Sequence, residues 1–153
     1  MTLATAEFPT ALRRFIYDQL LARGLPPSSE QIGEHFGVSA DDARGAIASL
    51  KIGKTVLPHP VTGEIWMAGP FAARPSTYRV FGNSIAWWAN CAWDALGIAA
   101  ATGREVSISS HCPDCDDRIE VRVANGRVTA SPPAAVGHFA VPAANWWDDI
   151  GFT

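Results

Sequence analysis

The chain has 153 residues, of which 48% are hydrophobic and 18% are charged, a composition typical of globular proteins and not of disordered ones. Its formal net charge is −3, and residues 1–75 are neutral, with seven basic and seven acidic side chains. Neither half therefore has the positive surface that proteins need to neutralise nucleic-acid phosphates, so we do not expect a nucleic-acid partner.

The sequence also indicates the cellular compartment of the protein. No apolar run approaches the roughly 20 residues that a membrane-spanning helix needs. The N-terminus lacks the basic start and apolar centre of a secretion signal. We therefore expect a cytoplasmic protein without a membrane partner. Its three cysteines, an odd number in a reducing compartment, favour metal binding or nucleophilic chemistry over disulfides.

The N-terminal part of the chain begins with two predicted helices. Apolar residues recur at helical spacing over about residues 10–23, and Gly24 ends the pattern. Ser28 and Gln31 have the spacing of a capping box, in which each side chain bonds a free backbone N–H group of the other residue. The short helix that they begin stops at Gly37.

A third helix and a β-hairpin follow. Ser39 begins this helix and Gly53 closes it. Residues 55–57 and 64–67 then flank a turn-rich segment, a pattern typical of a hairpin. Three helices and a hairpin are the outline of a winged helix, so residues 1–70 are predicted to form a winged-helix-like domain.

The predicted third helix is a poor candidate for DNA recognition. Asp41 and Asp42 lie near its N-terminal end, where their carboxylates would repel phosphate. We favour a structural scaffold over a DNA-binding role. The alternative function is a winged-helix metal- or thiol-responsive binding protein without catalytic activity.

The second half is predicted to start after a joint at residues 70–75, which is rich in proline and alanine. Residues 77–81 alternate like a strand. Asn83 or Ser84 can then cap a helix that runs to Gly103. This helix is nearly all apolar, so we expect it to be buried on most sides.

Cys91 and Asp94 lie three residues apart in this predicted helix, on one face, with Trp87 and Trp88 one turn earlier. A carboxylate in an apolar environment tends to have a raised pKa and is suited to proton transfer. A buried cysteine can instead be a small hydrophobic residue, and the aspartate can cap a loop. The combination of thiol and acid favours the catalytic interpretation.

Short strands are predicted after the helix, at residues 106–108, 119–123 and 127–130, with a tight turn at Asn125-Gly126. The fold class is therefore α+β. The winged-helix-like domain is followed, over residues 76–153, by a core of one buried helix and short antiparallel strands.

Cys112 and Cys115 form a C-x-x-C pair between two of these strands, which is half of a zinc site. His59, His111 and His138 are the remaining candidate ligands, and none has a diagnostic spacing. A thioredoxin-like redox motif is disfavoured because the pair joins two strands and does not begin a helix.

The segment NCAWDALGIAAATGREVSISSHC, residues 90–112, resembles the core of the alkylmercury (organomercurial) lyases, and HFAVPAANWWDDIGFT resembles the family's next segment. The resemblance implies a mercury-resistance enzyme that cleaves carbon–mercury bonds by protonolysis to Hg(II) and a hydrocarbon. It also implies that the N-terminal domain is structural. Organomercurials would be the substrates, small-molecule or protein thiols the mercury acceptors, and no cofactor is expected.

The resemblance also implies roles for individual residues. Cys91 corresponds to the first mercury-binding thiolate and Asp94 to the acid, whereas Cys112 matches a cysteine usually taken as non-catalytic. The family's second mercury-binding cysteine comes after the segment that ends here at Thr153. We therefore expect an incomplete C-terminus and impaired cleavage. Cys115 is a substitute thiolate that we disfavour, because it shares a loop with Cys112.

Overall fold

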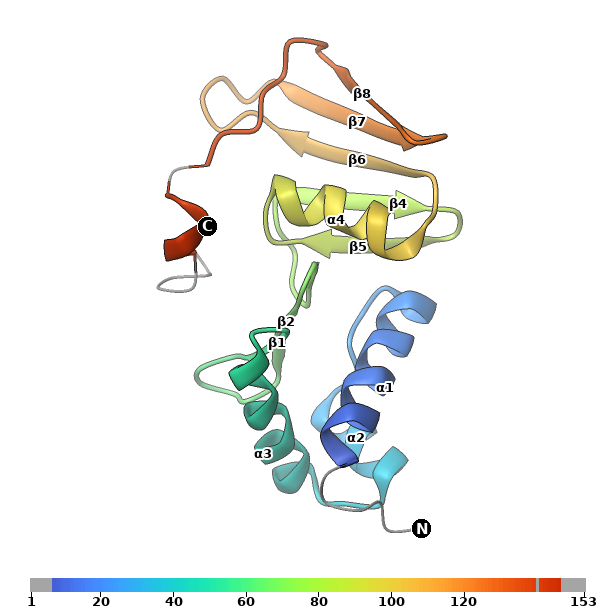
Figure 1. Ribbon diagram of the computed structural model, residues 1–153, viewed down its shortest axis with the longest axis vertical. Coiled ribbons are helices and arrows are strands. Elements are labelled where there is room, and N and C mark those ends of the chain that lie inside the picture. The colour runs from blue at the N-terminus through green and yellow to red at the C-terminus, as the bar shows by residue number, and fades with distance from the viewer. Residues whose placement is uncertain (1–6, 140, 147–153) are drawn as a thin grey trace. The chain divides into compact units, whose positions relative to one another are not determined.

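The computed structural model describes residues 7–139 and 141–146 (Figure 1). The chain divides into two compact units, Met1–Arg74 and Pro75–Thr153. Each unit has its own buried apolar residues, and each is described separately.

Three helices form most of the first unit: α1 (Phe8–Arg23), α2 (Ser29–Phe36) and α3 (Ala40–Leu50). Their ends follow the predicted caps. The capping box of Ser28 and Gln31 is present, and Ser39 accepts a hydrogen bond from the backbone N–H of Asp42. After α3 the short 3-10 helix η1 (Lys51–Gly53) completes the helical path. The helices bury one face each, formed mainly by Leu12, Ile16, Leu20, Ile32, Ala43 and Ile47.

The first unit also holds three short antiparallel strands. The predicted hairpin is present as β1 (Val56–Pro58) and β2 (Ile65–Ala68). A further strand, β3 (Phe71–Ala72), pairs with β2 and was not predicted. The hydroxyl of Tyr17 on α1 donates a 2.8 Å hydrogen bond to the carbonyl of Gly69, which fixes the turn between β2 and β3.

A polar cluster joins α2, α3 and the hairpin. Ser29 is fully buried, and both its backbone N–H and its hydroxyl bond to the Glu64 carboxylate. Arg44 completes the cluster by donating to the Ser29 hydroxyl at 2.7 Å. Because each buried polar group has a partner, the cluster fixes the hairpin against the helices without leaving an unsatisfied donor.

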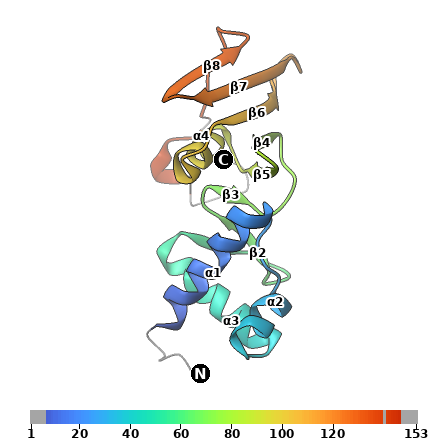
Figure 2. The same cartoon turned by 90° about the vertical axis from the view of Figure 1, so that its right-hand side faces the viewer.

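The described residues of the second unit form five antiparallel strands and one α-helix (Figures 1 and 2). The spatial order is β5-β4-β6-β7-β8, and α4 packs on β4 and β5. The elements are β4 (Tyr78–Gly82), β5 (Ile85–Ala89), α4 (Ala92–Thr102), β6 (Val106–His111), β7 (Arg118–Ala124), β8 (Arg127–Ser131) and the short 3-10 helix η2 (Ala143–Asn145). The strands predicted after residue 105 are confirmed.

The predicted helix over residues 84–103 is wrong in its first half. Residues 85–89 form β5, and Asn83-Ser84 is the turn of a hairpin between β4 and β5 and does not cap a helix. Asn83 has a positive φ of 54°, which asparagine tolerates better than most residues. An apolar run without periodicity cannot distinguish a buried strand from a buried helix, and tryptophan favours strands.

The helix α4 is also less buried than predicted. Its inward face consists of Ala95, Ile98 and Ala99, whereas Trp93 is 61% exposed and Leu96 is 39% exposed. An apolar sequence therefore does not place this helix in the interior, because only one face contacts the sheet. None of the described helices is both long and apolar enough to cross a bilayer.

Two tryptophans of the second unit provide a test of this architecture. Trp87 on β5 is fully buried, whereas Trp93 on α4 is largely exposed. Trp87→Ala should lower the free energy of unfolding by about 3–5 kcal/mol through loss of packing, and Trp93→Ala should change it by about 0.5 kcal/mol or less. Urea unfolding followed by circular dichroism measures both, and equal losses in the two variants would contradict the hairpin.

Candidate active site

Cys91 lies at the junction between β5 and α4. It is the N-cap residue of α4, with an extended backbone (φ −147°, ψ 178°), and its carbonyl accepts the first helical hydrogen bond from the N–H of Ala95 at 3.0 Å. An N-cap residue and the third helical residue lie side by side, as in a capping box. Asp94 occupies that third position, so the thiol and the carboxylate meet at the start of the helix.

The two side chains are in contact. The Cys91 thiol donates a hydrogen bond to Oδ2 of Asp94, with an Sγ–Oδ2 distance of 3.5 Å. The sequence places the pair on one helical face, and the structure brings them together at the helix end instead of within the helix. Their catalytic roles stay predictions.

Burial governs the protonation of this pair. It raises the pKa of Asp94 to about 6, and the hydrogen bond from Cys91 only partly opposes that change. Burial also raises the pKa of the Cys91 thiol, and the charge of Asp94 adds to the effect. In the free protein the thiol is therefore protonated, and the Asp94 carboxyl gains and loses its proton near pH 6.

Backbone dipoles oppose this effect at the sulfur. Cys91 accepts no full capping hydrogen bond, but the N–H groups of Asp94 and Trp93 lie close enough to Sγ to lower the pKa of the thiol. Free N–H groups at a helix N-terminus favour a negative charge. Desolvation therefore raises the free energy of the Cys91 thiolate, and the N–H groups at the start of α4 partly offset that increase.

Sequence reasoning missed the neighbours of the thiol on β4 and β6. Burial raises the pKa of Tyr78, the charge of Cys91 raises it further, and a hydrogen bond with buried Ser110 lowers it. Ser76 joins the ends of β4 and β5, since its hydroxyl bonds the carbonyl of Ala89 and accepts from the N–H of Tyr78 at 3.0 Å. Only the strand register, Tyr78 opposite Ala89, could have revealed these contacts.

The tryptophans near Cys91 are placed differently from the prediction. Trp87 and Trp88 lie on β5 and not one helical turn before Cys91. Trp87 belongs to the core, and Trp88 lies under the guanidinium of Arg79, with 4.0 Å between Cζ and the ring centroid. The tryptophan nearest to Cys91 in the chain is Trp93, two residues later, and its side chain is exposed.

Cys112 and Cys115 lie in the loop between β6 and β7. Cys112 is half-buried, Cys115 is exposed, and neither is in a disulfide. Within residues 7–139 and 141–146 no three histidine, cysteine, aspartate or glutamate side chains converge as a metal site. Within the second unit, neither of the candidate histidines His111 and His138 joins this cysteine pair as a metal ligand among the described residues.

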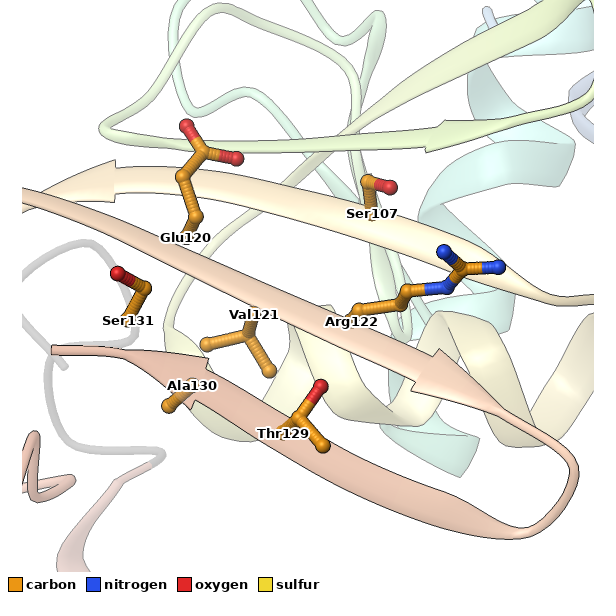
Figure 3. A pocket seen from close by; sticks show the side chains of 7 residues that line it. All are labelled: Ser107, Glu120, Val121, Arg122, Thr129, Ala130 and Ser131. Carbon is orange, nitrogen blue, oxygen red and sulfur yellow. The ribbon is translucent and has the colours of Figure 1, made fainter. Parts of the chain in front are cut away.

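A shallow depression on the sheet is not a competing site (Figure 3). Its lining comes from β6, β7 and β8, and its charged groups are already paired. Glu120 accepts from Ser109 at 2.9 Å and from Arg118, and Arg122 is 3.6 Å from Glu105. No thiol lines the depression, and the pKa of its acid, Glu120, is lowered whereas that of Asp94 is raised.

Comparisons with known proteins agree with each other. A family model described as alkylmercury lyase matches residues 71–153. An alkylmercury lyase from Streptomyces lividans is 30% identical over 116 residues, which are 76% of this chain and 52% of that protein. The chain therefore spans about half the length of this curated relative.

A solved structure, the mercury-bound form of MerB2, superposes with a TM-score of 0.61 at 21% identity. The match covers 85% of this chain and 62% of that one, and it shows the α+β fold. The last residues of the second resembling segment, 147–153, lie outside the described residues.

The raised pKa of Asp94 predicts a pH-dependent effect on stability. The folded-state value of about 6 lies above the ordinary 3.8, so the stability associated with the bound proton is present below pH 3.8 and lost as pH rises through 6. Asp94→Asn should therefore match the wild type at acid pH and exceed it above neutrality by on the order of 2 kcal/mol.

Urea unfolding at several pH values measures this difference. Asp18→Asn, at an exposed site on α1, is the matched control; because this variant keeps Asp94, its stability should follow that of the wild type at each pH. A stability difference between Asp94→Asn and the wild type that stays constant with pH would show that Asp94 has an ordinary pKa.

Proposed function

Because the chain belongs to the alkylmercury lyase family, we propose that Cys91 and Asp94 cleave the carbon–mercury bond of an organomercurial by protonolysis. The products are a hydrocarbon and Hg(II). The observation that carries the proposal is the 3.5 Å contact between the Cys91 thiol and an Asp94 carboxyl whose pKa is about 6. A nucleophile with its own base in contact is the arrangement that such chemistry needs.

Capture of the substrate is the first step. Mercury is a soft metal, so a thiolate is its preferred ligand. Asp94 accepts the proton of the Cys91 thiol as sulfur binds mercury, and the anionic ligand of the substrate leaves. The N–H groups of Trp93 and Asp94 stabilise the sulfur while it carries negative charge.

Cleavage is the second step. Electron donation from sulfur to mercury weakens the carbon–mercury bond and leaves carbanion character on carbon. Asp94 then delivers to that carbon the proton that it took from Cys91, so the bond breaks and the hydrocarbon leaves. Asp94 acts first as base and then as acid, for which a pKa near the working pH is suited.

Cleavage leaves mercury bound to Cys91 until another thiol accepts it. Of the three cysteines in the sequence, Cys91 is the one hydrogen-bonded to Asp94. With one thiolate at the site, we expect these 153 residues to capture mercury less tightly and to cleave more slowly than a site with two. A small-molecule or protein thiol would accept the product, as is available in the cytoplasm that we propose as its location.

We further propose that the first unit is a winged-helix-like scaffold without a nucleic-acid partner. The basic residue of α3 that could meet phosphate is Arg44, and it is already engaged. Its guanidinium lies 2.6 Å from Asp41 and 3.4 Å from Glu64. The alternative, a metal- or thiol-responsive winged-helix protein, would need free positive charge on that helix.

Cys91→Ser should abolish cleavage, because a hydroxyl is a poor ligand for mercury. The measurement is benzene released into the headspace from phenylmercuric acetate with excess thiol. We expect benzene from the wild type above the thiol-only control, and none above that control from the variant. Wild-type turnover retained in a Cys91→Ser protein with an unchanged circular dichroism spectrum would refute the assignment.

Asp94→Ala should separate capture from cleavage. Cys91 can still bind mercury, but the proton donor is gone, so phenylmercury should stay on the protein and benzene should not form. Mass spectrometry of the intact protein detects the bound phenylmercury group. Asp18→Ala on α1 is the control and should release benzene like the wild type, and equal release by Asp94→Ala would eliminate the proposed acid.

A further inference from the structure

We propose that Cys112 and Cys115 form a second mercury site, a dithiol that takes Hg(II) from Cys91 after cleavage. As a route for the product, the proposal rests on the proposed function. As a binding site for Hg(II), it rests on the loop between β6 and β7 alone.

The loop holds both thiols in one hydrogen-bonded turn. The N–H of Cys112 donates to the carbonyl of Asp117 at 2.8 Å, and the N–H of Asp116 donates to the carbonyl of Cys112 at 2.9 Å. The turn therefore closes on itself, with Cys112 at its start and Cys115 within it. The exposed Cys115 is open to an arriving ion, and Cys112 is partly exposed beside it.

The number of ligands selects the ion. Structural zinc takes four protein ligands, and no third ligand joins the two cysteines within the described part of the chain. Hg(II) forms stable complexes with only two thiolates in a linear arrangement, and soft sulfur is its preferred donor. The two thiols of the loop are therefore enough ligands for Hg(II) and too few for a structural zinc ion.

Electrostatics favour the thiolate at Cys112 over the thiolate at Cys115. The N–H group of Asp117 lowers the pKa of Cys115, but the hydrogen bonds with the side chains of Cys112 and Asp117 raise it overall. Backbone N–H groups of Cys115 and Asp114, together with the thiol of Cys115, lower the pKa of Cys112. The pKa of Cys91, in contrast, is raised by burial.

The topology places donor and acceptor at the same end of the sheet. β5 and β6 are both antiparallel to β4, so they run in the same direction on either side of it. Cys91 follows the end of β5 by two residues, and Cys112 directly follows the end of β6. Tyr78, at this end of β4, interacts with Cys91 and with Ser110, two residues before Cys112.

The transfer is a ligand exchange without change of oxidation state. The Cys112 thiolate attacks the mercury held by Cys91, which gives a complex with both sulfurs. The Cys115 thiolate then displaces the Cys91 sulfur, which leaves as a thiolate and takes up a proton. Mercury ends on Cys112 and Cys115, and Cys91 is again a thiol next to Asp94.

Binding is tested without any cleavage, in a Cys91→Ser background. The reduced protein receives one equivalent of HgCl₂ and then excess 2-mercaptoethanol, and the mercury left after desalting is measured by elemental analysis. We expect Cys91→Ser to retain close to one mercury per chain. Adding Cys112→Ser or Cys115→Ser should lower retention at least about tenfold, because two thiols on one loop bind at high effective concentration.

Cys115 is exposed, so Cys115→Ser should keep the fold, and its circular dichroism spectrum verifies this. Equal retention of mercury by Cys91→Ser and Cys91→Ser/Cys115→Ser would overturn the proposal. Since this arm uses no organomercurial, its result is independent of whether the protein releases benzene.

Transfer is tested in the wild type after a single turnover of phenylmercuric acetate without added thiol. Tryptic cleavage separates residues 80–104, which hold Cys91, from residues 105–118, which hold Cys112 and Cys115. Mercury on the second peptide supports the transfer, and mercury confined to the first overturns it. Absence of benzene with mercury retained in the binding arm would instead count against the proposed function.

Discussion

The change from strand to helix at Cys91 is the feature on which the candidate site depends. The chain leaves β5 in an extended conformation and enters α4 within one residue, so the first free N–H groups of the helix face the sulfur. The same geometry returns Asp94, one turn later, to within 3.5 Å of the thiol. One local conformation thus supplies the nucleophile, its base and the dipoles that stabilise negative charge, and no long-range contact is needed to pair them.

The surrounding sheet holds this junction in place and sets its chemistry. Trp87 anchors β5 in the core two residues before its end, and Ser76 bonds β5 to β4 just before Cys91. The same packing removes water from the pair, which raises the pKa of both groups. Rigidity and desolvation are therefore consequences of one arrangement, and a half-buried carboxyl is tolerated because the rest of the unit is well packed.

Elements with local signals could be predicted from the sequence, and those that depend on pairing could not. Ser28 and Ser39 predict the starts of α2 and α3 because they are capping residues, and Asn125-Gly126 predicts the hairpin of β7 and β8. The segment from Ser84 to Ala89 is uniformly apolar, so periodicity did not reveal β5, although Asn83 carried a turn signal.

Cys91 and Asp94 could be paired from spacing alone, because three residues separate neighbours both within a helix and across its N-cap. Tyr78 and Ser110 could not be found, because only the strand register brings them to the thiol.

The use of cysteine as an N-cap has a consequence for how the site can be observed. Serine or aspartate would bond the first-turn amides firmly, whereas the Cys91 thiol makes no full capping bond. In the free protein the protonated thiol therefore holds the first turn of α4 only weakly, and a bound metal, which replaces the thiol proton, changes the charge on the sulfur. Amide hydrogen exchange at Trp93 and Asp94 should consequently differ between the vacant and the metal-loaded protein, while the strands behind them exchange at unchanged rates. Amide exchange at the start of α4 therefore reports whether Cys91 has bound a metal, and no added label is needed.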